Sequence, residues 1–213
     1  MKQTEIFNHN KTVFVLYEKS GVVSKQYYEK GYNVIQIDLG LEPEKIDRWE
    51  KVKSDIRLFD YRPNLNVYAV ICFPPCTDLA GSGARWWEAK GLDALYDAMS
   101  MVDVCFRFYY LYKPEVFQIE NPVGRLSKKI GPPNFTYNPC DYAGYSSDEE
   151  AYTKRTCLWG EFNIPLAKPM APMLGSKMHL LPPTENRAEL RSKTPEGFTK
   201  AFVEVNSRNR KID

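Results

Sequence analysis

The sequence predicts an α/β fold, in which helices flank a mainly parallel sheet. Short apolar runs of strand length alternate along the chain with longer segments whose apolar residues recur every three or four positions. One run, VYAVIC at residues 67–72, is apolar at nearly every position, which is typical of strands buried on both faces of a parallel sheet. Alternation of this kind indicates strand–helix–strand units.

The first elements are predicted to be a strand, a helix and a strand. TVFVLY at 12–17 and NVIQID at 33–38 are the strands. The helix lies between them, and Gly31 is placed as its C-terminal stop. The segment EPEKIDRWEKV, residues 42–52, is then predicted to form a short helix before the apolar strand at 67–72.

The second half begins with the clearest helix of the sequence, which Pro114 ends. The apolar residues that recur along it are Leu92, Leu95, Met99, Val102, Phe106 and Tyr109. A buried strand, EVFQI at 115–119, comes next, and RTCLWG at 155–160 is a later strand. Thr194 is predicted to cap a final helix that begins with Pro195.

Length and composition favour one globular domain over residues 1–213. The chain is 43% hydrophobic and 26% charged, and its formal charge of +2 neither indicates nor excludes a nucleic-acid partner. Long stretches without periodicity, at about 122–150 and about 161–193, are predicted to be irregular. No apolar run approaches membrane-spanning length, and the first residues lack an apolar signal core, so a cytoplasmic protein is expected.

The five cysteines are an odd number, so reduced thiols are expected rather than a disulfide framework. Cys76 stands in the loop FPPC that directly follows the strand at 67–72, and Glu120 ends the next strand. Because ligands of parallel α/β sheets sit at the carboxyl ends of strands, both residues are candidates for a site. Taken alone, Cys76 is either a space-filling buried thiol or a nucleophile. The spacing of the cysteines and the absence of a nearby histidine in the sequence disfavour a metal site.

Four separated motifs carry a resemblance to a known family. PPCTDLAGSG at 74–83 resembles its nucleophile loop, and IENPVG at 119–124 resembles its Glu-Asn loop. YTKRTCLWG at 152–160 is similar to its arginine-bearing motif, and residues 182–202 are similar to the C-terminal segment of its small members. The sequence thus resembles the DNA cytosine methyltransferases that methylate ring carbon 5, especially the short phage-encoded members.

This resemblance implies a covalent mechanism. Carbon 5 of cytosine is a poor nucleophile until a thiolate adds to carbon 6, and Cys76 would supply that thiolate. The addition places negative charge on the ring, which the Glu120 carboxyl would neutralise at nitrogen 3. Asn121 would shape the loop, and Arg155 would orient the base or a neighbouring phosphate.

The resemblance also implies a Rossmann-like domain of the class I type that binds S-adenosylmethionine as methyl donor. Asp38, at the end of the second strand, would hold the donor ribose, and Asp55 would contact its adenine. Gly21 is the one glycine in the turn YEKSGVVS, where the family commonly has two or three. Tyr17 and Pro74 complete the expected donor contacts.

Substrate contacts are expected from Pro75, Thr77, Arg85 and Pro122, and Trp86 and Trp87 are either packing residues or base contacts. Full-length family members carry a recognition domain where this chain has only the irregular segment at about 161–193. The expected partner is therefore DNA, single-stranded DNA included, or a free pyrimidine nucleotide, with a partner protein as a possible source of specificity. A non-catalytic methyltransferase-like binding protein, of a kind that counters host defence, is the alternative from another class.

Overall fold

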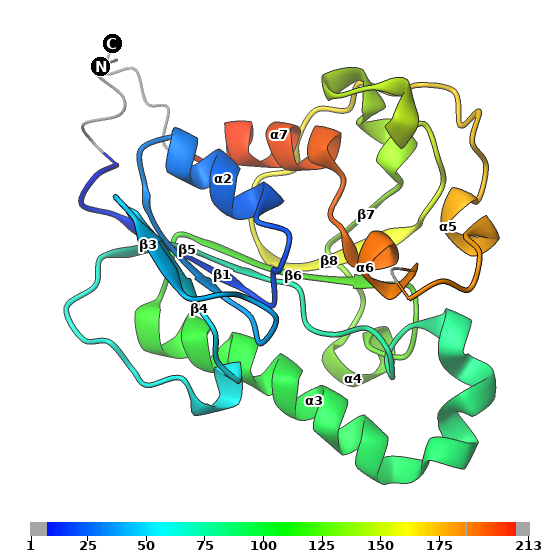
Figure 1. Ribbon diagram of the computed structural model, residues 1–213, viewed down its shortest axis with the longest axis horizontal. Helices are drawn as coiled ribbons and strands as arrows, with labels where there is room; N and C mark the ends of the chain where they lie inside the picture. Colours follow the sequence, from blue (N-terminus) through cyan, green and yellow to red (C-terminus); the bar gives the residue numbers. More distant parts are fainter. Residues whose placement is uncertain (1–7, 186, 208–213) are drawn as a thin grey trace.

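The computed structural model describes residues 8–185 and 187–207 and confirms an α/β fold with a mainly parallel sheet (Figure 1). Residues 1–7, part of the N-terminal segment considered above for a signal sequence, lie outside this range. Within the described chain, eight strands form one sheet in the order β3-β4-β2-β1-β5-β6-β8-β7. The strands are β1 (Thr12–Leu16), β2 (Asn33–Ile37), β3 (Glu44–Ile46), β4 (Trp49–Val52), β5 (Val67–Cys72), β6 (Val116–Pro122), β7 (Phe135–Tyr137) and β8 (Thr156–Glu161).

Helices cover both faces of the sheet. Figure 1 shows α2 (Val22–Glu29) and α7 (Glu196–Val205) side by side on one face and the long α3 (Trp87–Tyr112) across the other. The short helices α4 (Ser127–Ile130), α5 (Lys177–Leu180) and α6 (Arg187–Ser192) lie toward the right of the view, where the parallel strands end. The 3-10 turns are η1 (Ile56–Leu58), η2 (Gly81–Trp86), η3 (Pro139–Asp141), η4 (Ala143–Tyr145) and η5 (Asp148–Glu150).

The order of the parallel strands determines where a ligand can bind. From β1, strands β2 and β4 extend toward one edge of the sheet, and β5 and β6 extend toward the other. The order therefore reverses between β1 and β5, and in open α/β sheets ligands bind beside the carboxyl ends at such a reversal. Strand β8 then runs antiparallel to β6, so β8 begins at the edge where β6 ends.

The apolar strands are buried because both of their faces pack on helices. In β1, Phe14 and Leu16 belong to the core beneath α3, whereas Val13 and Val15 belong to the core beneath α2 and α7. Every residue of this strand is buried. This two-sided burial explains why polar and apolar residues do not alternate along the strand.

The prediction of a helix over residues 42–52 is wrong. This segment forms the hairpin of β3 and β4, and β4 pairs in parallel with β2. Asp47, with φ 51°, makes the turn between the two strands. The segment extends the sheet because the open edge of β2 offers hydrogen-bond partners that a local pattern does not reveal.

The long helix and the last helix also differ in detail from prediction. The long helix begins at Trp87 and is broken at Gly91, whose φ of 70° is not helical, and Leu92 is 63% exposed instead of packed in the core. Helix α7 begins one residue later than predicted, with Pro195 in the capping position. Gly31 ends α2 as expected, in a left-handed conformation with φ 89°.

The stretch at 122–150 is less irregular than predicted, because it contains α4, β7 and three 3-10 turns. Its last residue has a structural role. The Glu150 carboxylate accepts hydrogen bonds from the backbone N–H groups of Glu196 and Gly197, and so caps α7. Among the described residues, no helix is both long enough and apolar enough to cross a membrane.

Candidate active site

The candidate residues gather at one edge of the sheet, although the sequence separates them widely. Pro74, Pro75, Cys76 and Thr77 follow the carboxyl end of β5, and Glu120, Asn121 and Pro122 form the carboxyl end of β6. Arg155 directly precedes β8, which starts at this edge because it is antiparallel to β6. Tyr17 and Asp38 follow β1 and β2.

The loop after β5 and the loop after β6 are hydrogen-bonded to each other. The buried Asn121 side chain donates from Nδ2 to the Pro74 carbonyl at 2.8 Å. The Gly81 N–H donates to the Val123 carbonyl at 2.8 Å. We call residues 73–81 and 121–125 the interlocked loops. They hold Cys76 in a fixed position relative to Glu120, and the Asn121 side chain joins the two loops.

Gly124 allows the interlocked loops to approach this closely. A Cβ atom at this position would lie 1.9 Å from the Leu79 carbonyl oxygen and 2.8 Å from the Ala80 Cα. Both are backbone atoms, so they cannot move aside as a flexible side chain can. The glycine that ends IENPVG is therefore required for the contact between the two loops.

Cys76 is the most accessible thiol of the protein. The other cysteines, all within the described residues, are buried, whereas Cys76 is partly exposed. Burial and then the Glu120 carboxylate raise the pKa of the Cys76 thiol, while the Lys154 ammonium and the Arg191 guanidinium lower it. The thiol thus lies among charged groups that control how much thiolate it forms.

Glu120 is half-buried at the end of β6. Burial raises the pKa of its carboxyl, and the Lys154 ammonium partly opposes that effect. A carboxyl with a raised pKa holds its proton closer to neutral pH, so it can donate a hydrogen bond or a proton to a ring nitrogen. The raised pKa of Glu120 suits the acid role, whereas the raised pKa of Cys76 favours the thiol over the thiolate.

Lys154 is a site residue that the sequence analysis missed. Its Nζ donates to the Arg191 carbonyl at 2.7 Å, and its charge acts on both Cys76 and Glu120. Arg155 is exposed, and its charge lowers the pKa of the Cys157 thiol instead. Neighbouring residues of an extended chain point in opposite directions, so the pair of basic residues in TKR does not reveal which one faces the site.

The residues expected to bind the donor are neighbours at the ends of β1, β2 and β4. The Tyr17 N–H donates to the Ile37 carbonyl at 2.8 Å, and the Asp38 N–H donates to the Val52 carbonyl at 3.1 Å. The Asp38 carboxylate accepts from the Gly40 N–H through Oδ1 at 2.7 Å. This arrangement leaves Asp38 half-buried, with one carboxylate oxygen engaged by Gly40, and its role as a ribose ligand stays a prediction.

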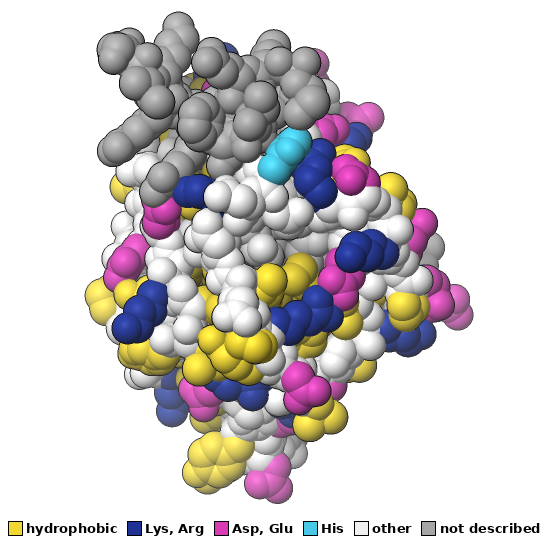
Figure 2. Space-filling model, turned by 90° about the vertical axis from the view of Figure 1, so that its left-hand side faces the viewer, with side chains coloured by type: hydrophobic (Ala, Val, Ile, Leu, Met, Phe, Trp, Pro, Cys, Tyr) yellow, Lys and Arg dark blue, Asp and Glu magenta, His cyan; other side chains and the backbone are white. Residues whose placement is uncertain are grey.

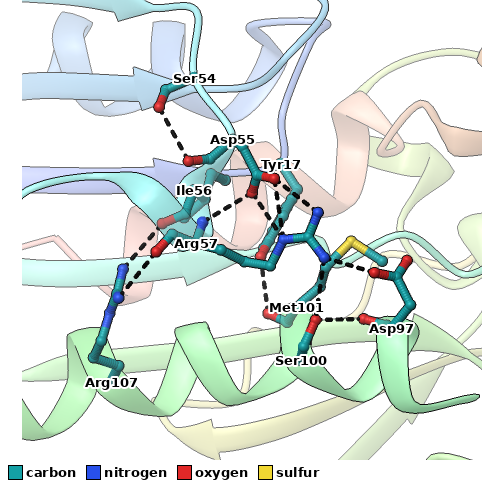
Figure 3. A network of polar contacts seen from close by, with 9 residues as sticks. All are labelled: Tyr17, Ser54, Asp55, Ile56, Arg57, Asp97, Ser100, Met101 and Arg107. Carbon is teal, nitrogen blue, oxygen red and sulfur yellow. Dashed lines mark hydrogen bonds and ion pairs between the residues drawn. The ribbon is translucent and has the colours of Figure 1, made fainter. Parts of the chain in front are cut away.

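Asp55 is part of a polar network that joins η1 to α3 (Figure 3). Both of its carboxylate oxygens accept from the Arg57 guanidinium, which also pairs with Asp97 at 2.6 Å. The hydrogen bond from Arg57 lowers the pKa of Asp55. Tyr17 lies beside this network and donates to the Met101 carbonyl at 2.9 Å. An adenine amino group would have to share Asp55 with Arg57.

The turn after β1 depends on a buried acid that the sequence analysis did not select. The Glu18 carboxylate accepts from the Val23 N–H at 2.7 Å and from the Ser24 hydroxyl at 2.6 Å, and so occupies the N-terminus of α2. Gly21 precedes the helix with φ 73°, and a Cβ there would meet the Trp49 ring at 3.3 Å. With an acid already at the helix N-terminus, this turn is unsuited to the phosphate of a dinucleotide.

A cavity of about 490 Å³ opens beside this turn. Its lining includes Lys19, Ser20 and Gly21 from the turn after β1 and Gly40 and Leu41 from the loop after Asp38. Cys76 and Glu120 are not among the lining residues. The size suits a nucleoside-like ligand. Of the residues expected to bind the donor, only Gly21 lines this cavity, and Asp38 lies outside its lining.

The residues expected to contact substrate lie in the interlocked loops and in η2. Pro75, Thr77 and Arg85 are exposed, and Pro122 is half-buried. The Arg85 guanidinium lies 5.1 Å from the centroid of the Trp86 ring, which is 55% exposed. Trp87 differs from Trp86, since it is half-buried beneath Arg125 with 4.5 Å between guanidinium and ring.

Comparisons of the chain with models of protein families and with curated proteins find no match. Its function is therefore inferred from the site itself.

Proposed function

We propose that this protein transfers a methyl group to carbon 5 of cytosine in DNA, through a covalent adduct with Cys76. The observation that carries the proposal is the placement of Cys76 and Glu120 on adjacent parallel strands, joined by the bond between Asn121 and Pro74. The sheet supports it as well, because five parallel strands followed by an antiparallel one resemble the class I methyltransferase arrangement.

In this mechanism, the steps that activate carbon 5 are assigned to residues of the chain. The Cys76 thiolate adds to carbon 6 of the ring, and Glu120 gives a proton to nitrogen 3, so that carbon 5 becomes nucleophilic. Lys154 stabilises the thiolate before the addition, and Asn121 holds the acid in place. S-adenosylmethionine, if bound beside Asp38, would supply the methyl group and leave as S-adenosylhomocysteine. Loss of the carbon 5 proton to a base then breaks the bond between Cys76 and carbon 6, which restores the ring and the free cysteine.

Trapping on DNA that contains 5-fluorocytosine tests the covalent step. Fluorine at carbon 5 blocks completion of the reaction, so the wild-type protein is expected to form an adduct that withstands denaturation when the donor is present. The oligonucleotide is supplied both single-stranded and as a duplex. Cys76→Ala abolishes the adduct, whereas Cys140→Ala, a buried thiol elsewhere, retains it. An adduct of unchanged yield in Cys76→Ala would refute the mechanism.

A non-catalytic binding protein on the same scaffold remains the second candidate. The observation that favours it is the pairing of both Asp55 carboxylate oxygens with Arg57, together with Lys19 and Ser20 in a turn that is glycine-rich in the family. Calorimetry with S-adenosylmethionine distinguishes the two candidates. Micromolar binding that is lost in Asp38→Ala and kept in the exposed control Asp103→Ala supports the enzyme, and no binding supports the scaffold.

We further propose a cytoplasmic location for this activity. Its basis is the set of five free cysteines, which suits a reducing compartment and keeps the Cys76 nucleophile available.

A further inference from the structure

A closed turn of the backbone begins at Cys76. The Cys76 carbonyl accepts hydrogen bonds from two backbone N–H groups, that of Leu79 at 3.0 Å and that of Ala80 at 2.8 Å. Residues 76–80 therefore form a single turn of helical type that is not continued as a helix. These bonds fix the backbone that carries the thiol, but they do not determine where the turn lies relative to Glu120.

Arg125, from the loop after β6, holds this turn at two points. Its Nε atom donates to the Asp78 carbonyl at 2.7 Å, and its backbone N–H donates to the Leu79 carbonyl at 2.9 Å. The bond from the charged guanidinium is of the stronger kind. Two bonds to consecutive carbonyls also fix the orientation of the turn, because a single bond would allow rotation about its own axis.

The cysteine lies midway between two side-chain hydrogen bonds from the β6 loop. Asn121 binds the Pro74 carbonyl, two residues before Cys76, and Arg125 binds the Asp78 carbonyl, two residues after it. Both donors belong to the segment that directly follows Glu120 in the chain. A loss of either bond therefore frees one side of the cysteine to move relative to that carboxyl.

The first turn of α3 supports the Arg125 side chain. The guanidinium lies over the ring of Trp87, the first residue of α3, at 4.5 Å from the ring centroid. The Asp78 carboxylate is bound to the same helical turn, where Lys90 donates from Nζ at 2.6 Å. Packing against the ring restricts a long side chain that would otherwise sample many rotamers, so the guanidinium is held ready to bind the carbonyl.

The partners of Arg125 indicate that it acts through geometry. On the face of the molecule at the left of Figure 1, Lys and Arg side chains are interspersed with Asp and Glu (Figure 2). The Arg125 guanidinium instead binds a backbone carbonyl and an aromatic ring. Lys154 and Arg191 are the cations whose charges lower the pKa of Cys76.

We propose that Arg125 is a positioning residue, which holds the turn that begins at Cys76 against the loop that follows Glu120 and ties both to the start of α3. The proposal rests on the roles of Cys76 and Glu120 in the function proposed above. It concerns the separation of these two groups and makes no use of the methyl donor.

The test measures alkylation of Cys76 by iodoacetamide against pH, by peptide mass spectrometry, without DNA or donor. Arg125→Met keeps an apolar stem beside Trp87 and removes Nη2, a buried atom without a hydrogen-bond partner among the described residues, so this variant is expected to fold. Burial and the Glu120 carboxylate raise the pKa of the thiol, and both effects weaken when the turn moves away. Alkylation at pH 8 should then be about 3- to 10-fold faster. Loss of a positive charge alone would raise the thiol pKa and slow the reaction instead.

A second measurement separates positioning from a general loss of stability. Glu120→Gln should speed alkylation in the otherwise wild-type protein, but by less than about twofold when residue 125 is changed to methionine, because the carboxylate then lies farther from the thiol. A merely structural role would lower the melting temperature and leave the effect of Glu120→Gln unchanged. Arg107→Met is the matched control, since Arg107 also donates to a backbone carbonyl, that of Ile56 at 3.0 Å, but joins α3 to η1. It should leave both measurements unchanged.

Two outcomes would overturn the inference. They are equal or slower alkylation of Arg125→Met, and an effect of Glu120→Gln that persists undiminished in that variant. If Arg125→Met does not fold, Arg125→Lys replaces it, because lysine keeps the charge and lacks the planar guanidinium; alkylation at the wild-type rate would again overturn the inference. A positioning effect without any 5-fluorocytosine adduct refutes only the proposed reaction, and an adduct without a positioning effect refutes only this inference.

Discussion

Replacing Gly124 by alanine tests whether the interlocked loops position the site. The new Cβ would lie 1.9 Å from the Leu79 carbonyl oxygen, whereas ordinary contact begins at 3.4 Å, so the loops must separate by about 1.5 Å. Overpacking of this kind costs about 1–3 kcal/mol. For a chain of this length, that cost lowers the melting temperature by about 2–12 °C.

The functional effect should exceed the effect on stability. A displacement of about 1 Å in a catalytic group costs about 100-fold in rate, so 5-fluorocytosine trapping by Gly124→Ala should be at least that much slower at a temperature where the variant is folded. Gly81→Ala is the matched control, since its Cβ would be 3.2 Å from the Val123 carbonyl and needs a shift of only a few tenths of an ångström. A Gly124→Ala protein with wild-type melting temperature and trapping rate would refute the reasoning.

Three further predictions concern charged groups. Because the Glu120 carboxylate raises the pKa of Cys76, Glu120→Gln should lower that pKa. Alkylation of Cys76 by iodoacetamide at pH 8 should then be about 3- to 10-fold faster, as measured by peptide mass spectrometry. Lys154→Met should slow the same alkylation by a similar factor, while Arg155→Met changes it by less than twofold; equal effects of the two would contradict the assignment of Lys154. Glu18→Gln places an amide among hydrogen-bond donors and should reduce the free energy of unfolding by about 1–3 kcal/mol. A chemical denaturation midpoint equal to that of the wild type would exclude the capping role of Glu18.

Much of the fold could be predicted because its signals are local. Two-sided burial requires apolar residues throughout strands such as 67–72, and a left-handed helix end requires a glycine such as Gly31, so both features are visible in the sequence. The hairpin at 44–52 was missed because its residues gain their strand conformation from the edge of β2, a partner distant in the sequence. Leu92 was placed in the core because periodicity does not reveal the break at Gly91.

The candidate site divides in the same way. The sequence by itself determined that a proline-held cysteine and a glutamate follow two successive buried strands, since residue identity and strand ends are local properties. Only the tertiary structure decided that Asn121 joins their loops and that the charge of Lys154, and not that of Arg155, shifts the pKa values of both groups. It also decided that the Asp55 carboxylate is hydrogen-bonded to Arg57. Those facts depend on side-chain direction and on contacts between segments that are distant in the sequence. Such contacts arise from the order and handedness of the folded sheet, which a linear sequence pattern does not specify.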